Sequence, residues 1–434
     1  MRKLTAFLFL LPVVLILSGC SEAKTESSFI TVSGKQFIKD GKPYNYIGTN
    51  YWYGASLAAD TLGGDRARLA EELDFLKVNG IDNLRVMVGA EGPDLSPFRV
   101  TPTLVKAPGV YSPALLEGLD YFLNELKKRD MHAILFLTNN WEWSGGMAQY
   151  VNWNGYGDYA NPNVEGFTWA DFFAYQKQFY SCDSCVSQLN RFIESIVMRT
   201  NRINGLAYRD DPTIMAWELA NEPRPMADDN FDPFRKWIRE SAALIRKLDK
   251  HHLITTGNEG TQGCSGSMEL FEEIHALPEI DYLTIHIWLK NWRWYDANDP
   301  ENTFPAALEK VDRYIEDHLK VAEKLDKPMV IEEFGLARDF ESFKPGTPVS
   351  YRDRYYDHIF SAIAASVKSS GYLAGCNFWT FGGFTNPIEG QIYWKPGDPF
   401  GGDPPQEEQG LNSVFPSDSS TIGLIKKYNE LLKR

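Results

Sequence analysis

Eight short, strongly apolar segments alternate along the chain with longer stretches of helical periodicity. The apolar segments span residues 44–52, 81–88, 132–141, 213–222, 252–259, 280–288, 327–335 and 373–383. Their near-continuous apolar character predicts strands covered on both faces, as in a parallel sheet. Eight strand-helix units predict an α/β fold, a single (β/α)8 barrel with long βα loops. An open doubly wound sheet is the alternative, but no glycine-rich phosphate loop follows an early strand.

The helical stretches carry recognisable ends. In residues 112–128, Ser112 can cap the helix, Pro113 suits its first turn, and the leucines fall on one face. Residues 351–369 and 421–432 show the same periodicity. We therefore expect helices in these three stretches.

The N-terminal residues 29–43 alternate apolar and polar side chains around Gly34 and Gly41. This pattern predicts a small β-hairpin that plugs the lower end of the barrel. No long Ser-, Pro- or Gly-rich linker interrupts the chain after residue 30, so residues 29–434 are expected to form one domain.

The first residues have the pattern of an export signal. Arg2 and Lys3 precede an apolar run that is too short for a membrane span. The run ends in Leu17-Ser18-Gly19-Cys20, which resembles the bacterial lipobox. The resemblance implies a lipoprotein signal peptide over residues 1–19, lipidation of Cys20 and a short tether over residues 20–28. The protein is then exported and lipid-anchored to a bacterial membrane, with the outer membrane favoured, on its periplasmic or extracellular face. An ordinary secreted protein with a chance cysteine is the alternative.

Charge and cysteine content exclude several classes of function. The net charge of −14 disfavours nucleic acids and other polyanions as partners. Cys182 and Cys185 have C-x-x-C spacing without a second ligand pair, which favours a local disulfide or two free thiols over a zinc or redox site. Seven histidines in 434 residues give no metal-ligand pattern, so neither a metal nor a cofactor is expected.

Polar residues follow the predicted strands at the edge where a barrel of this kind has its active site. They include several carboxylates, one arginine, one histidine, several amides and several tryptophans: Asn50, Trp52, Arg85, Asn139, Asn140, Trp141, Asn221, Glu222, Glu259, His286, Trp288, Glu332, Glu333 and Trp379. A pair of carboxylates beside aromatic faces suits cleavage of a glycosidic bond. One carboxyl group protonates the leaving oxygen and the other attacks or supports the cationic sugar carbon.

The segments "WELANEP" (217–223) and "VIEEFG" (330–335) resemble glycoside hydrolase family 5, a family of retaining (β/α)8 enzymes. The resemblance implies that Glu222 is the acid/base and Glu333 the nucleophile. It also matches Arg85, His286 and Trp379 to family positions. "NEPRP" with Arg224, "NNWEWSGGMAQY" (139–150) and "GNEG" (257–260) are similar to the β-mannanase branch. The strand-end positions and this resemblance together predict the substrate-binding residues Trp52, Arg85, Asn140, Trp141, Asn221, Arg224, Glu259, His286, Trp288 and Trp379.

Neighbouring carboxylates have other expected roles. Glu218 lies inside an apolar strand, which favours a buried carboxylate paired with a basic side chain. Glu332 and Glu333 are adjacent, so alternation along a strand predicts that only one of them faces the barrel mouth. The resemblance of Glu333-Phe334-Gly335 to the family implies that this residue is Glu333, which leaves Glu332 with a partner on the helix side. For catalysis, the pKa of Glu222 is expected to be raised by burial and that of Glu333 lowered by Arg85.

The sequence therefore predicts a retaining β-mannan hydrolase that cleaves β-1,4-mannosidic bonds as a mannan endo-1,4-β-mannosidase. Its partner is a neutral β-mannan or its oligosaccharides. An exo-acting β-mannosidase is the nearest alternative, because the loop "WLKNWRWYDANDPENTFP" (288–305) and the segment "GDPPQEEQG" (402–410) resemble exo-acting bacterial enzymes of the same branch. A β-1,4-glucanase and a non-catalytic glycan-binding lipoprotein are further alternatives.

Overall fold

Eight parallel strands form the centre of the computed structural model, which describes residues 28–433. Their order in the sheet is β10-β9-β8-β5-β4-β13-β12-β11. The strands are β4 (Tyr46–Asn50), β5 (Asn83–Met87), β8 (His132–Phe136), β9 (Ile214–Glu218), β10 (Leu253–Thr255), β11 (Leu283–Ile287), β12 (Met329–Phe334) and β13 (Leu373–Phe378). Each of the eight falls inside a segment predicted from the sequence, and the (β/α)8 barrel is confirmed.

Backbone hydrogen bonds join the two outer strands of this sheet. The amide of Asp281 donates to the carbonyl of Ile254 at 2.9 Å, and the amide of His286 donates to that of Glu259 at 3.1 Å. These bonds connect the ends of β10 and β11, so the sheet closes on itself as a barrel. Every residue of the eight strands is buried, as expected where helices cover the outer face.

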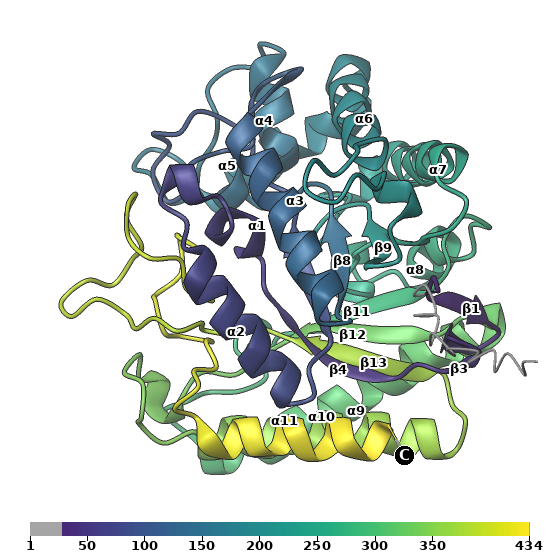
Figure 1. Cartoon of the computed structure of the whole chain (residues 1–434), viewed down its shortest axis with the longest axis vertical. Coiled ribbons are helices and arrows are strands. Elements are labelled where there is room, and N and C mark those ends of the chain that lie inside the picture. Colours follow the sequence, from purple (N-terminus) through teal and green to yellow (C-terminus); the bar gives the residue numbers. More distant parts are fainter. Residues whose placement is uncertain (1–27, 434) are drawn as a thin grey trace, which may run out of the picture.

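Helices surround the strands (Figure 1). They are α1 (Gly54–Leu57), α2 (Arg66–Val78), α3 (Pro113–Lys128), α4 (Gly146–Trp153), α5 (Trp169–Gln176), α6 (Asp183–Val197), α7 (Phe231–Leu248), α8 (Met268–His275), α9 (Pro300–Leu325), α10 (Ser350–Lys368) and α11 (Ser419–Leu432). The Ser112 side chain accepts from the amide of Leu115 and Pro113 lies in the first turn of α3, as predicted. A short antiparallel pair, β6 (Val105–Ala107) and β7 (Val110–Tyr111), precedes α3.

The N-terminal hairpin predicted for residues 29–43 is a three-stranded antiparallel sheet of β1 (Thr31–Ser33), β2 (Gln36–Lys39) and β3 (Lys42–Pro43). Phe37 of this sheet packs edge-to-face on Tyr282, with ring centroids 5.3 Å apart, and belongs to a buried cluster with Tyr46 and Met215. Those residues lie at the beginnings of barrel strands. The small sheet therefore plugs the lower end, opposite the loops that follow the strands.

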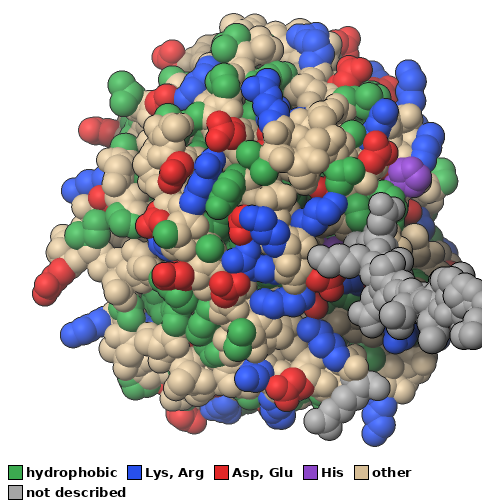
Figure 2. Space-filling model, in the orientation of Figure 1, with side chains coloured by type: hydrophobic (Ala, Val, Ile, Leu, Met, Phe, Trp, Pro, Cys, Tyr) green, Lys and Arg blue, Asp and Glu red, His purple; other side chains and the backbone are tan. Residues whose placement is uncertain are grey.

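Cys182 and Cys185 form a disulfide at the start of α6, one of the two states expected from their spacing. Cys264 and Cys376 are free and buried. On the face shown in Figure 2, acidic and basic side chains are interspersed rather than gathered by sign. No helix within residues 28–433 combines the length and apolar character needed to cross a bilayer. The predicted signal peptide, Cys20 and most of the tether lie outside the described residues.

Candidate active site

A cleft of about 450 Å³ opens at the carboxyl ends of the barrel strands. Side chains from most of the βα loops line it: Trp141, Glu142, Trp143, Asn163, Trp169, Phe173, Asn221, Glu222, Arg224, Glu259, Gln262, Trp288, Asn291, Trp292, Glu333, Trp379, Pro404, Gln406 and Glu407. The lining combines acidic, amide and aromatic groups. It is therefore suited to a ligand with hydroxyl groups and apolar faces.

Arg85 of β5 is the fully buried centre of the polar network beneath the cleft. Its Nε and Nη2 donate to the two carboxylate oxygens of Glu218 at 2.7 and 2.5 Å. Its Nη1 donates to Glu333 at 2.5 Å, and its Nη2 also donates to the Asn221 side chain at 2.7 Å. Glu218 is thus the paired carboxylate that the sequence predicts. The bidentate pair fixes the plane of the guanidinium, which in turn orients the cleft residues Glu333 and Asn221.

Glu222 lies in the turn that follows β9, with a backbone φ of 51°. Its amide donates to the carbonyl of Gly257 at 3.0 Å, which ties this turn to the neighbouring loop after β10. Its Oε1 lies 2.7 Å from Nδ1 of His286, and its Oε2 accepts from the indole Nε1 of Trp141. Both carboxylate oxygens are therefore held in place before any ligand binds.

Glu333, near the end of β12, faces Glu222 across the cleft floor. Besides Arg85, it accepts a hydrogen bond from Trp288 Nε1 at 3.3 Å, and His286 Nδ1 lies 3.4 Å from its Oε2. One oxygen of Glu222, one of Glu333 and a ring nitrogen of His286 all lie within 4.8 Å of one another. A cation could reach these three donor atoms only after His286 had released its Nδ1 proton.

The charge state of this group differs from the sequence-based expectation. Burial raises the pKa of Glu222, but the hydrogen bond and charge of His286, the charge of Arg224 and the Trp141 N–H outweigh it and hold the pKa at about 2. Burial lowers the pKa of His286, whereas the Glu333 and Glu222 carboxylates raise it to about 10. The expected rise in the pKa of Glu222 is therefore wrong for this ligand-free site. Both shifts favour a proton on His286, whose Nδ1 lies 2.7 Å from Glu222 and 3.4 Å from Glu333.

Arg224 extends the network along one wall of the cleft. Its guanidinium donates to Glu259 and stacks on the Trp141 ring, 4.7 Å from the centroid. Burial raises the pKa of Glu259 to about 7, with the charge of Arg224 opposing the rise and that of Glu222 adding to it. Arg224 and Glu259 thus meet beside Glu222, as their positions after β9 and β10 suggest.

Comparison with known proteins identifies the family of this chain. A family model described as GH family 5 beta-mannosidase-like matches residues 27–434. The chain belongs to glycoside hydrolase family 5. The resemblance seen in the sequence is confirmed, and the protein is a glycoside hydrolase.

The similar proteins include some named as mannan endo-1,4-beta-mannosidases and others named as mannosidases. The chain is 30% identical over 376 residues to the putative mannan endo-1,4-beta-mannosidase 9 of Oryza sativa subsp. japonica, covering 84% of each chain. It superposes on the glycoside hydrolase family 5 mannosidase from Rhizomucor miehei with a TM-score of 0.86 at 35% identity, covering 94% of this chain and 98% of the other. A variant of that mannosidase was solved in complex with mannosyl-fructose. The endo-1,4-beta-mannanase from the same organism, with a TM-score of 0.67 at 23% identity over 94% of this chain and 99% of the other, shares the fold.

Two residues that the sequence analysis placed in the substrate-binding site do not line the cleft. Trp52 is 1% exposed, because its Nε1 donates to the carbonyl of Gly402 at 2.6 Å and its ring packs on Trp143. Asn140 is fully buried, and its side-chain oxygen accepts from Gln176. For these two residues, direct substrate contact is wrong in this structure. The remaining predicted residues lie in the cleft or, for Arg85 and His286, directly beneath it.

The expected helix-side partner of Glu332 is also wrong. Its Oε1 accepts from Tyr282 at 3.2 Å, and its Oε2 lies 3.9 Å from Arg85 Nε, inside the barrel. The reason is a register irregularity: Ile285 pairs with Ile331, but His286 pairs with Glu333. Glu332 is the extra residue in this pairing, so simple alternation fails there.

Several cleft residues were missed from the sequence, because they lie in the long connections between strands rather than at the strand ends. Trp169 and Phe173 come from α5, whereas Pro404, Gln406 and Glu407 come from the loop after β13. The one available signal is compositional, namely aromatic residues in long βα loops. Trp292, which the sequence left open between packing and binding, lines the cleft.

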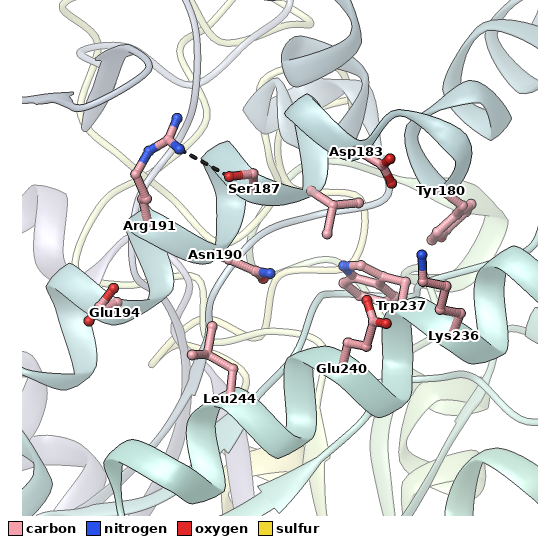
Figure 3. Close-up of a pocket in the computed structure, with 11 residues that line it drawn as sticks. Tyr180, Asp183, Ser187, Asn190, Arg191, Glu194, Lys236, Trp237, Glu240 and Leu244 are labelled. Atoms are coloured by element: carbon pink, nitrogen blue, oxygen red, sulfur yellow. Dashed lines mark hydrogen bonds between the residues drawn. The ribbon is translucent and has the colours of Figure 1, made fainter.

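A second cavity, of about 340 Å³, lies between α6 and α7 on the outside of the barrel (Figure 3). Figure 3 shows that its charged groups, among them Asp183, Glu194 and Glu240, are spread along the two helices rather than pointing at one centre. Arg191 donates to Ser187 of its own helix at 3.0 Å. This arrangement offers no pair of acid and base groups, so the cleft is the candidate active site of the family 5 enzyme.

Proposed function

We propose that this protein is a retaining, exo-acting β-mannosidase that releases mannose from the non-reducing ends of β-1,4-linked mannan and mannooligosaccharides. The observation that carries the retaining hydrolase is that one carboxylate oxygen of Glu222 and one of Glu333 lie within 4.8 Å of each other in the cleft. The likeness to a family 5 mannosidase, at a TM-score of 0.86 and 35% identity, supports the mannosidase assignment.

The separation of the two carboxylates favours double displacement. Retaining enzymes hold their carboxyl groups about 5–5.5 Å apart, whereas inverting enzymes need about 6.5–9.5 Å to admit a water. An oxygen of Glu333 attacks the anomeric carbon while the glycosidic C–O bond breaks and Glu222 delivers a proton to the leaving oxygen. Water then attacks the same carbon, gives its proton to Glu222 and displaces Glu333.

His286 holds the proton that Glu222 needs. In the ligand-free site the imidazolium and the Glu222 carboxylate are joined by a 2.7 Å hydrogen bond. A sugar bound over Glu222 removes water and brings the glycosidic oxygen to the carboxylate, which favours moving the Nδ1 proton to Glu222 and on to the leaving group. Asn221 and Arg85 hold the surrounding donors fixed, so the cleft requires little reorganisation.

The two ends of the cleft differ, which favours exo action over endo action. The loop after β13 contributes Pro404, Gln406 and Glu407 to the cleft lining, and β13 pairs with β12, the strand that carries Glu333, so this wall stands at the Glu333 end. Asp403 ties this loop down by accepting from the amides of Gly410 and Asn412, each at 2.8 Å. A wall at the nucleophile end leaves room for a terminal sugar and obstructs a chain that continues past it.

Endo cleavage, which the sequence analysis placed first, remains the second candidate. The observation that favours it is the 30% identity to a protein named as a mannan endo-1,4-beta-mannosidase. Action on β-1,4-glucan and glycan binding without hydrolysis are the further alternatives.

A product time course distinguishes these functions. With mannotetraose and linear mannan as substrates, we expect mannose as the sole early product. A mixture of longer oligosaccharides at the earliest times would establish endo action. Faster release of glucose from β-1,4-glucan would establish a glucanase, and mannan binding without reducing-sugar release would establish a binding protein. In the same assay Glu333→Ala, which removes the attacking carboxylate, should lower kcat at least about 10³-fold while leaving the protein folded, as circular dichroism would show.

A further inference from the structure

Trp169, which has no role in the proposed mechanism, stands at the mouth of the cleft on helix α5. Trp169 is 46% exposed and lines the cleft. It is the first residue of α5, where the capping box of Thr168 and Asp171 fixes the helix start through bonds of 3.2 and 2.8 Å. The ring is therefore presented at a defined position rather than on a loose loop.

Aromatic contacts hold one edge of the Trp169 ring and leave the rest free. The ring packs at 84° on Trp141 and at 90° on Phe172, with centroids 5.9 Å apart in both cases. Phe173 approaches the ring at 5.9 Å as well. A large apolar side chain that is built in on one side and half exposed on the other is a typical binding surface rather than a core residue.

The contact between Trp141 and Glu222 shows on which side of the cleft this ring lies. Trp141 Nε1 donates to Glu222 Oε2, whereas Trp288 Nε1 donates to Glu333 at the opposite carboxylate. The acid protonates the oxygen that departs with the leaving group, so the leaving sugars lie on the Glu222 side. Trp169 stands next to Trp141 on that same side.

We propose that Trp169 is a platform for the leaving-group sugars, and this inference rests on the proposed hydrolysis of mannosidic bonds. Its free face stacks on the C–H face of a sugar beyond the scissile bond. Asn163, which lines the cleft and donates to Glu142 at 2.7 Å, supplies a polar edge for hydroxyl groups nearby. The enzyme consequently prefers substrates whose leaving group is itself a mannose chain over substrates with a small leaving group.

The test compares leaving groups in Trp169→Ala. With mannotriose, we expect kcat/KM to fall about tenfold, mainly through a higher KM, because one aromatic-sugar contact is lost. With β-mannosyl fluoride, whose leaving group carries no sugar, the fall should be much smaller. Trp169→Phe, which keeps an aromatic face, should recover most of the activity on mannotriose.

Tyr156→Ala is the matched control. Tyr156 is also 46% exposed and lies between α4 and α5, but it does not line the cleft. It should leave both substrates unaffected. Equal losses of Trp169→Ala on mannotriose and on the fluoride, or no loss on either, would overturn the platform. An unmutated protein that releases no mannose from mannotriose would instead overturn the proposed function.

Discussion

Both carboxylate oxygens of Glu222 already have donors in the ligand-free site, from His286 on one side and Trp141 on the other. This arrangement positions the group but also favours its ionised form. The protonation of Glu222 is therefore coupled to that of His286. Its pKa is set by this neighbour more than by burial alone.

Stabilisation by the Glu222–His286 pair should be largest between about pH 4.5 and 6.5. The pKa of Glu222 falls from its usual 4.5 to about 2, so its contribution is present above pH 4.5 and is lost as the pH falls towards 2. Burial lowers the pKa of His286, but the Glu333 carboxylate, together with Glu222, raises it from its usual 6.5 to about 10, so this contribution is present below pH 6.5 and is lost as the pH rises towards 10. The part that depends on Glu222 follows the same pH window.

The Tm difference between the unmutated protein and Glu222→Gln, followed by calorimetry from pH 3 to pH 10, measures this dependence. The difference in the free energy of unfolding that corresponds to this Tm difference should pass through a maximum of roughly 1.5–3 kcal/mol, the usual range for hydrogen bonds to a charged group. Glu316→Gln, at an exposed position on α9, serves as the control and should give a flat difference. A flat difference for Glu222→Gln as well would contradict the assignment of the proton to His286.

Trp52 and Trp141 show how far residue-level prediction reaches. Each is the last residue of a predicted strand segment, and the sequence analysis gave both the same role. Trp141 lines the cleft because Glu222 accepts its N–H and α5 packs against its ring. Trp52 turns away because the carbonyl of Gly402 accepts its N–H, so it holds the start of the wall at the Glu333 end. Glu222 and Gly402, which accept these two N–H groups, are distant in the sequence from Trp141 and Trp52, so no local pattern predicts the contacts.

The turns that follow β9 and β10 pack against each other, and this packing fixes the position of Glu222 at the rim of the barrel. Gly257, with φ of 72°, passes so close to the neighbouring turn that an added Cβ would lie 2.0 Å from the Ala220 carbonyl oxygen and 2.3 Å from Glu218 Oε1. Its own carbonyl accepts from the amide of Glu222. This close approach requires glycine.

Gly257→Ala should therefore lower the free energy of unfolding by roughly 3 kcal/mol or more and reduce activity by displacing Glu222. Gly63→Ala is the matched control, because φ is 84° and no atom lies within 4 Å of the added Cβ. It should lose only about 1–2 kcal/mol, the contribution of the left-handed conformation, with full activity. Urea unfolding and mannotriose hydrolysis measure the two effects, and similar values for both variants would argue against the close packing of Gly257.

At the scale of elements, periodicity located every barrel strand but not the strand ends. The segment predicted as residues 252–259 contains a strand of only Leu253–Thr255, because the backbone turns to bring Glu259 to the cleft. Helix α5 and the wall that carries Glu407 were not foreseen, because their placement depends on packing against distant loops. What the sequence predicted well is therefore set by local periodicity, and what it missed is set by tertiary contacts.

In the whole molecule, one end of the barrel is closed by the N-terminal sheet and the other end bears the cleft. The small N-terminal sheet seals the end where the strands begin, and the cleft opens where they finish. Figure 1 shows β1 and β3 at one end of the barrel strands and the loop between β13 and α11 at the other. We propose that the chain is exported and lipid-anchored through Cys20. Ser28 donates to Asp40 beside β2, so an anchor would attach at the end remote from the cleft.

This arrangement predicts that anchoring and catalysis are independent. A bacterium expressing the unmutated gene with labelled palmitate should incorporate label into the membrane fraction, whereas Cys20→Ser should carry no label and leave that fraction. Because the cleft faces away from the anchored end, kcat/KM for mannotriose should agree within about twofold between the membrane-bound and released forms. Label that persists in Cys20→Ser would refute the lipobox. A marked rise in activity on release would show that the membrane obstructs the cleft, contrary to the opposed ends of this barrel.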